Sequence, residues 1–447
     1  MDYNLYPQHA RVQCREPDAT VPGAPRPGIS ESAQQNRRGL YSGRVRETVG
    51  VRQANLARLL HLVHHSGPLS RAALTEATGL NRSTIADLVT ELVAEGLVVE
   101  RAPDPSRRVG RPSPMVAADP AVLALAVNPE VDAVTVAAVG LDRRIAARAR
   151  IEVSAPPTPE STVALVSAQL AQWQAGDLAS SRIVAIGVAV PGLVRRADGL
   201  VREAPHLDWT DAPLGTLFQA ATGLTAFVAN DASLGALAEH LFGAAVGVDD
   251  AVYLNGGASG IGGGLIVNGM AVTGAGGYAG EFGQNRPGIA EATDRRAPGG
   301  VLEDEVSRAR LLEAVGLTGA DEPTLAAALA DAARDADAST GVGLEVARQR
   351  RILSTALANA VNVLNPQVVV LGGFLATLAT WDLAELTDLV RAQSMPANAA
   401  DVELLPAALG EDRLLIGAAE AAFSDLLADP LRAIGAPASA APSSPAG

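Results

Sequence analysis

The chain contains no lysine, so arginine supplies all 35 of its basic side chains. It has a single cysteine, Cys14, which excludes an internal disulfide and any zinc site built from a cysteine cluster. No stretch of about eighteen unbroken apolar residues occurs, and the first residues lack the apolar segment of a secretory signal. These absences predict a protein of the reducing cytoplasm that has no membrane partner.

Charge is distributed unevenly along the 447 residues. The whole chain carries a net charge of −14, which by itself argues against a nucleic-acid partner. Residues 1–118, however, hold 15 arginines and 11 acidic residues, a net +4, whereas residues 119–447 hold 20 arginines and 38 acidic residues, a net −18. A small, mildly basic head therefore precedes a large acidic body, and each needs its own explanation.

Composition and periodicity divide the chain into four segments. Residues 1–48 are rich in Pro, Gly, Gln, Ser and Arg without a hydrophobic period, which predicts a disordered tail. Residues 49–118 predict a small helical domain, and residues 119–432 predict a larger domain in which strands and helices alternate. The Ala/Pro/Ser-rich residues 433–447 predict a second unstructured tail.

The helical domain has the pattern of a winged helix-turn-helix. Apolar residues recur at helical spacing in a first helix that ends near residues 66–67. Ser70 and Asn81 are placed to cap a second and a third helix, with Gly79 as the break between them. Two short strands, at 97–100 and 114–118, flank an arginine-rich loop. This order of elements is typical of a winged DNA-binding unit.

Contacts to DNA are predicted at the third helix and at the wing. The first turn of the third helix can reach base edges in a major groove, and an arginine of the wing can enter a narrow minor groove. The alternative is a protein-binding or dimerisation module with solvated surface arginines. The predicted DNA-binding residues are Ser70, Arg71, Asn81, Arg82, Ser83, Thr84, Arg107, Arg108, Gly110, Arg111 and Pro112.

The body has an α/β pattern and contains a glycine-rich stretch at 254–303. Three strands in hairpins come first, then a helix at Ser161–Ala175, and the last predicted helix covers residues 414–427. In the glycine-rich stretch, backbone N–H groups can approach a ligand closely. Glu281, Gln284 and Glu303 can bind its hydroxyl groups. The alternative is a glycine-rich hairpin with acidic surface residues.

Seven motifs of the body, in order along the chain, resemble the ROK family of repressors and sugar kinases. They are VAVPG at 188–192, APHLDW at 204–209, ANDASLGALAEHLFG at 229–243, SGIGGGLIVNG at 259–269, AGEFG at 279–283, LE at 302–303 and NPQVVVLGG at 365–373. The resemblance implies an α/β fold: a two-lobed actin/hexokinase-like domain behind the winged helix-turn-helix. It also implies a sugar site at Asn230, Asp231, Glu281 and Glu303, in which Asp231 matches the catalytic base of the kinases. The side-chain amide of Gln284 can add a hydrogen bond to a sugar hydroxyl there.

Two departures from the family pattern bear on the function. Gln284 stands where the family has a histidine, and residues 286–301 lack the cysteines that hold its structural zinc. The turn that cradles ATP phosphates in the kinases corresponds here to Val127-Asn128-Pro129-Glu130, which has no glycine and one N–H group fewer. The second phosphate loop persists only in part, as residues 258–260.

These observations predict a transcriptional regulator, most simply a repressor, rather than an enzyme. Its expected partners are an operator in double-stranded DNA, a sugar or sugar derivative as effector, and a second copy or three further copies of the chain. We predict no catalytic residue, no metal and no cofactor. The alternatives are a ROK sugar kinase with an attached DNA-binding head, and a body without a ligand that serves in dimerisation or protein docking.

Overall fold

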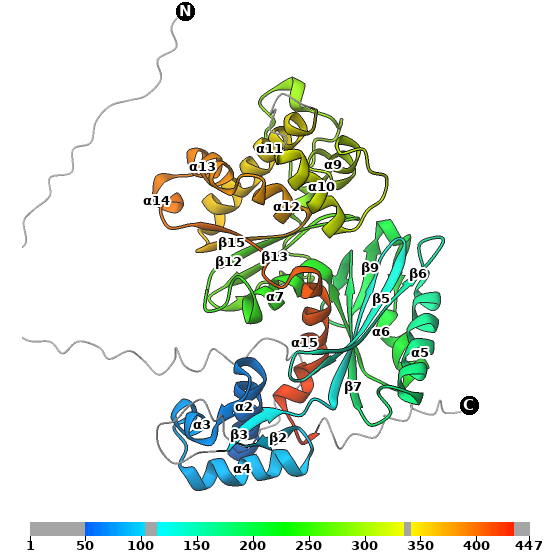
Figure 1. Cartoon of the computed structure of the whole chain (residues 1–447), viewed down its shortest axis with the longest axis vertical. Coiled ribbons are helices and arrows are strands. Elements are labelled where there is room, and N and C mark those ends of the chain that lie inside the picture. The colour runs from blue at the N-terminus through cyan, green and yellow to red at the C-terminus, as the bar shows by residue number, and fades with distance from the viewer. Residues whose placement is uncertain (1–49, 103–113, 335–340, 433–447) are drawn as a thin grey trace, which may run out of the picture. The chain divides into compact units, whose positions relative to one another are not determined.

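The computed structural model describes residues 50–102, 114–334 and 341–432. All of them belong to the part of the chain that begins at Gly43. Figure 1 shows their helices and strands. The two predicted tails and the centre of the wing, residues 103–113, lie outside the described residues. Among the described residues, no helix combines the length and the apolarity needed to cross a membrane.

The first described domain is a winged helix, as predicted. Its three helices bury one apolar stripe each against a common core, and its strands form a sheet in the order β1-β3-β2. Strand β1 was not predicted, because two residues are too few to show an alternating pattern. The elements are α2 (Val51–Ser66), β1 (Leu69–Ser70), α3 (Arg71–Thr78), α4 (Arg82–Ala94), β2 (Val98–Arg101) and β3 (Met115–Ala118).

A five-stranded sheet in the order β11-β7-β4-β5-β6 begins the body. Its central strand β4 is buried along its whole length, whereas the edge strand β6 alternates between half-buried and exposed residues. Helices α5 (Pro159–Ala175) and α6 (Leu214–Thr222) contact each other. The strands are β4 (Val122–Pro129), β5 (Ala133–Gly140), β6 (Ile145–Glu152), β7 (Arg182–Val190) and β11 (Ala226–Asn230), and β8 (Leu193–Arg195), β9 (Leu200–Ala204) and β10 (Trp209–Ala212) form a smaller sheet.

A second five-stranded sheet has the order β14-β13-β12-β15-β16. Strand β15 lies between two parallel neighbours and is buried along its length, which explains why valine and leucine make up its first four residues. The strands are β12 (Ala251–Gly257), β13 (Gly260–Val267), β14 (Met270–Ala271), β15 (Val368–Gly373) and β16 (Glu403–Pro406). The helices of this half are α8 (Leu302–Glu305), α9 (Arg308–Ala314), α10 (Glu322–Arg334), α11 (Gly341–Leu364), α12 (Phe374–Thr380), α13 (Leu383–Gln393) and α14 (Pro396–Ala399).

Two helices connect the sheets. Helix α7 (Asp231–Phe242) packs on β13 and β12 of the second sheet, and α15 (Arg413–Ala428) packs on β7 and β4 of the first. The two helices also pack against each other. The approach of α15 to the sheet is close, because a Cβ atom on Gly187 of β7 would overlap the carbonyl oxygen of Ala418. Helix α15 is therefore held at backbone contact distance.

The winged helix shares its hydrophobic core with the body. One cluster of buried residues runs from α2, α3 and α4 through α15 to β4, β5 and β7. The link from β3 to β4 is only three residues long, and Asp119 N–H donates to the Leu97 carbonyl at 3.0 Å. The Arg182 guanidinium donates to the carbonyl oxygens of Glu95 and Gly96 at 3.2 and 3.3 Å. No flexible linker separates the described parts of the two domains.

Two sequence predictions need correction. Asn128 and Pro129 belong to β4, opposite Thr135 and Val134, instead of forming a turn. The turn is Glu130–Asp132, closed by the Glu130 N–H donating to the Ala133 carbonyl at 2.8 Å, so proline stands at a strand end, where its missing N–H is tolerated. Helix α5 starts two residues earlier than predicted, because Thr158 caps it and proline fits its first turn.

We expect Gly187→Ala to lower the free energy of unfolding by roughly 1–3 kcal/mol, because the added methyl group must displace α15 or β7. The measurement is urea denaturation followed by circular dichroism. Gly288→Ala is the matched control, because no atom lies within 4 Å of the place that its added Cβ atom would take. Equal stability of the two variants would contradict the close contact between α15 and the sheet.

Candidate functional site

Asn230 and Asp231 lie where β11 ends and α7 begins. The Asn230 side chain caps α7, since its Oδ1 accepts from Ser233 N–H at 2.9 Å. Its Nδ2 donates to the Gly192 carbonyl at 3.1 Å and to Asp231 Oδ1 at 3.2 Å. Asp231 Oδ1 also accepts from Ala232 N–H at 2.8 Å. These bonds fix the half-buried Asp231 carboxylate and engage only one of its two oxygens among the described residues.

Glu303 and Gln284 are brought together on the second half of the body. Glu303, on α8, accepts from Ile261 N–H at 3.2 Å and from the Gln284 side-chain amide. Glycine is required at position 260, because its φ is +128° and a Cβ atom there would collide with the Glu303 carboxylate. Because Gly260 has no side chain, the Glu303 carboxylate can approach the backbone of the β12–β13 hairpin.

Neighbouring carboxylates affect the pKa values of two of the predicted acids, Asp231 and Glu281. Burial, together with the nearby Glu281, raises the pKa of Asp231 to about 7, although the Ala232 N–H and Arg413 act in the opposite direction. Burial and then Glu303 raise the pKa of Glu281. Acids that are held close together at a cost in stability are typical of binding sites. The cluster can accept hydroxyl hydrogen bonds, and it can bind a proton near neutral pH.

Hydrogen bonds and ion pairs hold the loop at residues 286–301, which stands where the family has its zinc segment. Glu305 is fully buried and accepts from the backbone N–H groups of Arg296 and Ala297 at 2.9–3.0 Å. Arg348, which is 2% exposed, donates to Glu305 Oε2 at 3.1 Å and to the Asp294 carbonyl at 2.8 Å. A buried arginine–glutamate pair thus anchors this loop, which lies between Gln284 and Glu303.

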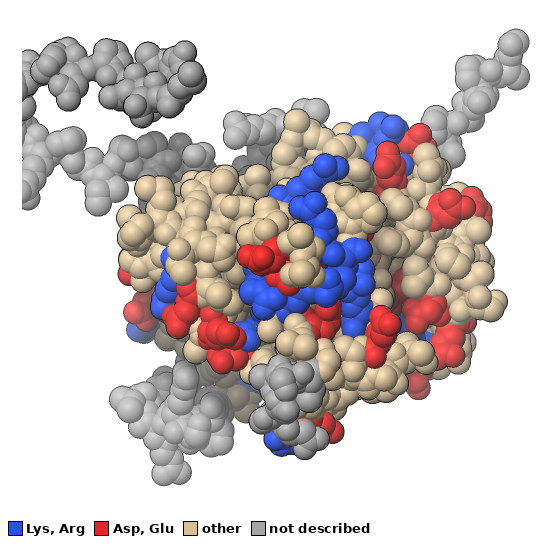
Figure 2. Space-filling view, turned by 90° about the horizontal axis from the view of Figure 1, so that it is seen from above, with Lys and Arg blue, Asp and Glu red and all other residues tan. Residues whose placement is uncertain are grey.

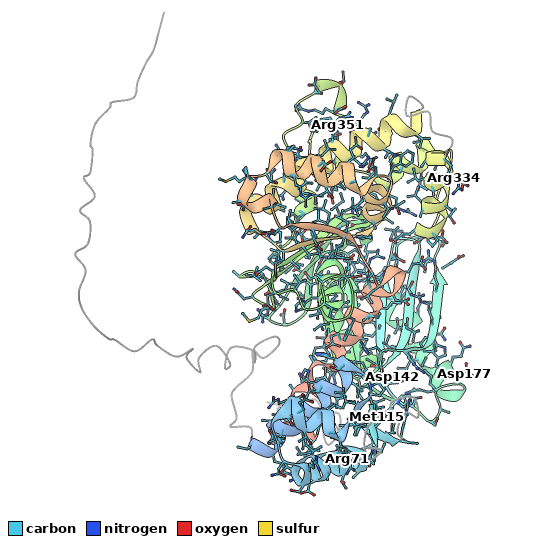
Figure 3. The ribbon with its side chains drawn as sticks, turned by 60° about the vertical axis from the view of Figure 1, so that its left-hand side comes forward. Arg71, Met115, Asp142, Asp177, Arg334 and Arg351 are labelled. Carbon is cyan, nitrogen blue, oxygen red and sulfur yellow. The ribbon has the colours of Figure 1, made fainter. Side chains whose placement is uncertain are left out.

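Further ion pairs lie on the outside of the same region. Arg351 makes a bidentate contact to Asp294 at 2.9–3.1 Å, and Figure 3 shows Arg351 on this part of the body. Figure 2 shows arginine side chains gathered beside acidic ones on the face seen from above. Acidic side chains border the arginines, so this face carries both signs of charge.

The structure places the described DNA-binding candidates at the starts of α3 and α4. Ser70 caps α3 through Ala73 N–H at 3.1 Å, and Asn81 caps α4 through Thr84 N–H at 2.8 Å. Arg71, marked in Figure 3, pairs with Glu100 of β2 at 2.6 and 2.8 Å. Arg82 and Ser83 are exposed in the first turn of α4, and Thr84 is half-buried. The wing candidates Arg107, Arg108, Gly110, Arg111 and Pro112 lie outside the described residues.

Comparison with known proteins identifies the family. The ROK family model matches residues 125–424, and a MarR family model matches residues 55–108. The chain therefore belongs to the ROK family, and a MarR-like winged helix precedes its ROK domain.

Individual relatives include both regulators and kinases. A xylose repressor of Caldicellulosiruptor bescii is 25% identical over 404 residues, which cover 85% of this chain and 98% of the repressor. A glucokinase of Halalkalibacterium halodurans is 30% identical over 253 residues, 53% of this chain and 75% of the kinase. The structure of a ROK family transcriptional regulator, a homologue of the E. coli MLC protein, has the same fold, with a TM-score of 0.66, 23% identity and coverage of 86% of this chain and 99% of that one.

We expect Glu305→Gln to destabilise the fold by roughly 1–3 kcal/mol, because it removes one of the two carboxylates that pair with the buried Arg348, Glu345 being the other, and weakens the charge-assisted bonds to the loop. Urea denaturation measures the change, and Glu313→Gln, on the exposed side of α9, is the control. A loss below about 1 kcal/mol would mean that the loop does not depend on this pair.

The raised pKa of Asp231 predicts a pH-dependent effect of Asp231→Asn. Between the ordinary aspartate pKa of 3.8 and about 7, the folded state retains a proton that the unfolded state has lost, so stability falls as pH rises. The variant removes this penalty. Its free energy of unfolding should exceed that of the parent by on the order of 4 kcal/mol at pH 8 and should match it near pH 3.5. A difference that does not change with pH in denaturation series would contradict the assigned pKa.

Proposed function

We propose that the chain is a DNA-binding transcriptional repressor of carbohydrate-metabolism genes and that its body binds a sugar or sugar derivative. The observation that carries this proposal is the continuous core between the winged helix and the domain that contains the carboxylate cluster. A relative named xylose repressor aligns across both parts, which supports a sugar as effector. Such a protein works where the DNA is, in the cytoplasm.

The proposed effector site consists of Asn230, Asp231, Glu281, Gln284 and Glu303. An ionised carboxylate accepts short, strong hydrogen bonds from hydroxyl groups, so several carboxylates suit a polyol better than an apolar or anionic ligand. A hydroxyl that donates to Asp231 needs the ionised form. Because the pKa of Asp231 is about 7, sugar binding should therefore weaken below neutral pH.

The proposed DNA contacts are those of a winged helix. The exposed start of α4 offers Arg82 to a base edge or a phosphate, and its free N–H groups favour an anion. Ser70 and Asn81 act there mainly as caps that orient α3 and α4. Winged helices commonly read paired half-sites, so we propose a homodimer or homotetramer as the binding form.

The kinase alternative has support in the similarity to a glucokinase and in the position of Asp231. Against it stands the first hairpin of the body, because Pro129 ends β4 and the turn Glu130–Asp132 contains no glycine. Phosphoryl transfer depends on positioning and on charge stabilisation around the phosphates. An acidic turn without glycine provides neither, so we propose that the chain is not an enzyme.

The test begins with an operator selected from a random DNA pool by the full-length chain. Fluorescence anisotropy then measures operator affinity in a panel of pentoses and hexoses, and we expect one sugar to change it by about 5–150-fold. Asp231→Ala and Glu281→Ala should abolish this response and keep the sugar-free operator affinity. Arg82→Ala should weaken operator binding by about 1–3 kcal/mol and keep sugar binding.

Asp304→Asn, an exposed neighbour of Glu303, is the control and should respond to sugar like the parent. Sugar phosphorylation from ATP that disappears in Asp231→Asn would establish the kinase alternative instead. Operator affinity that no sugar changes would favour a body used only for dimerisation or docking.

A further inference from the structure

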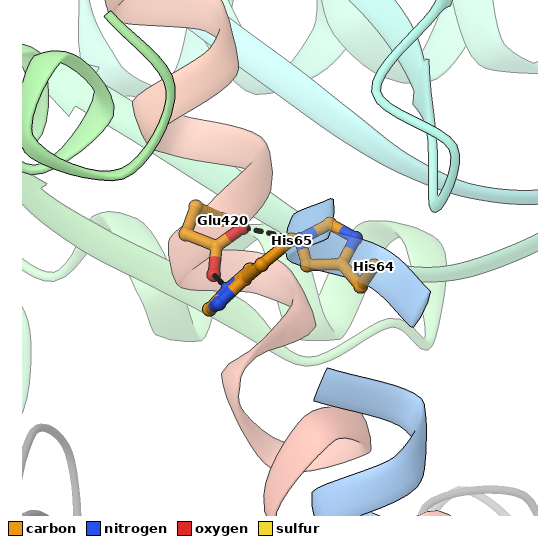
Figure 4. Close-up of side chains that lie close together, drawn as sticks. All are labelled: His64, His65 and Glu420. Carbon is orange, nitrogen blue, oxygen red and sulfur yellow. Dashed lines mark hydrogen bonds and ion pairs between the residues drawn. The ribbon is translucent and has the colours of Figure 1, made fainter. Parts of the chain in front are cut away.

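Three of the six histidines in the chain occupy one face of α2, at positions 61, 64 and 65. His64, which is 2% exposed, and His65 both reach Glu420 on α15 (Figure 4). The Nε2 atom of His64 lies 2.7 Å from Glu420 Oε2, and Nε2 of His65 lies 3.3 Å from Glu420 Oε1. The cluster therefore bridges the winged helix and the last helix of the body.

The orientation of His64 is that of a metal ligand. Its Nδ1 lies 2.6 Å from the Leu141 carbonyl oxygen, which can only accept, so Nδ1 carries a proton. The 2.7 Å contact between Nε2 and Glu420 Oε2 needs a shared proton, so an ion that binds at Nε2 displaces that proton. Metal-binding histidines are commonly held in this way, with the second ring nitrogen donating to a backbone carbonyl.

Two further basic side chains lie beside the cluster. The ring of His61 lies 5.3 Å from that of His65, and Arg143 lines the small cavity next to His64 and Glu420.

The donor atoms lie close enough to share one ion. Those of His64, His65 and Glu420 all lie within 4.8 Å of one another, and ligand atoms around tetrahedral zinc are separated by roughly 3.3 Å. A cavity of about 10 Å³ beside the cluster is bordered by His64, Arg143 and Glu420 among apolar residues. Two imidazoles, one carboxylate and a water are a common zinc ligand set.

We propose that His64, His65 and Glu420 bind one divalent transition-metal ion of the zinc class, which fastens α2 of the winged helix to α15 of the body. The imidazole ligands select Zn²⁺, Co²⁺, Ni²⁺ or Cu²⁺ over Mg²⁺ and Ca²⁺. This site goes beyond the proposed function and does not depend on it. The proposal differs from the sequence prediction of no metal. That prediction rested on the missing cysteines of the family, and one sequence does not show that residues 356 positions apart lie together.

Cobalt is the probe, because tetrahedral Co²⁺ has intense visible absorption. Untagged full-length chain is freed of metal and titrated with Co²⁺, and equilibrium dialysis with metal analysis gives the stoichiometry. We expect one ion per chain with a tetrahedral spectrum. His65→Ala and Glu420→Gln should each weaken binding at least about tenfold. His206→Ala, which removes an exposed histidine of another segment, should bind like the parent.

A thermal melt provides a second readout. Zn²⁺ should raise the Tm of the parent and of His206→Ala but not that of His65→Ala. His65 is about a third exposed, so its loss leaves the fold intact even if Glu420→Gln does not fold. The proposal is overturned if the parent binds no Co²⁺, or if His65→Ala binds it as tightly as the parent. Equal weakening in His206→Ala and His65→Ala would mark the binding as adventitious and would also overturn it.

Discussion

The packing of α15 is the constraint on which the rest of the structure depends. This single helix contacts the first sheet of the body, helix α7, which begins at Asp231, and helix α2 of the winged domain. At Gly187 its backbone touches the sheet without an intervening side chain. Because close-packed interfaces move as units instead of deforming continuously, we propose that a shift of α7 would be passed to α15 and from there to α2. Asp231 is the first residue of α7, and it therefore lies at one end of a contact path that ends at the DNA-binding domain.

We propose that a ligand acts on this contact path at the carboxylate cluster of Asp231, Glu281 and Glu303. Asp231 and Glu281 are held partly buried with raised pKa values, so the ligand-free site is electrostatically unfavourable. In the proposed function, hydroxyl donors from a sugar would relieve that cost, and the free energy released would favour one arrangement of α7 over another. Glu303 is tied to the β13 backbone and to Gln284, and the buried Arg348–Glu305 pair anchors the intervening loop. The second half of the site is thus rigid without the zinc that the family resemblance would imply at that loop.

Much of this could be predicted from the sequence where the signal is local. Helix periodicity and the caps Ser70 and Asn81 identified the winged helix, and the ordered motifs identified the body. The sugar site that the motifs imply at Asp231, Glu281 and Glu303 stays a prediction, and the mutual influence of these carboxylates on their pKa values supports it. The turn near Pro129 was misplaced, because a proline at the end of a strand and a proline in a turn look alike in one sequence. The Arg348–Glu305 and His64–Glu420 pairs could not be foreseen, since 43 and 356 residues separate their members.

The central claim is that effector and operator binding are coupled through this packing, and coupling of this kind is reciprocal. Isothermal titration calorimetry can measure the sugar affinity of the full-length chain alone and saturated with operator. The account predicts that operator changes the sugar Kd by the same factor by which sugar changes the operator Kd, about 5–150-fold. A sugar that binds with the same Kd in the presence and absence of operator would contradict it.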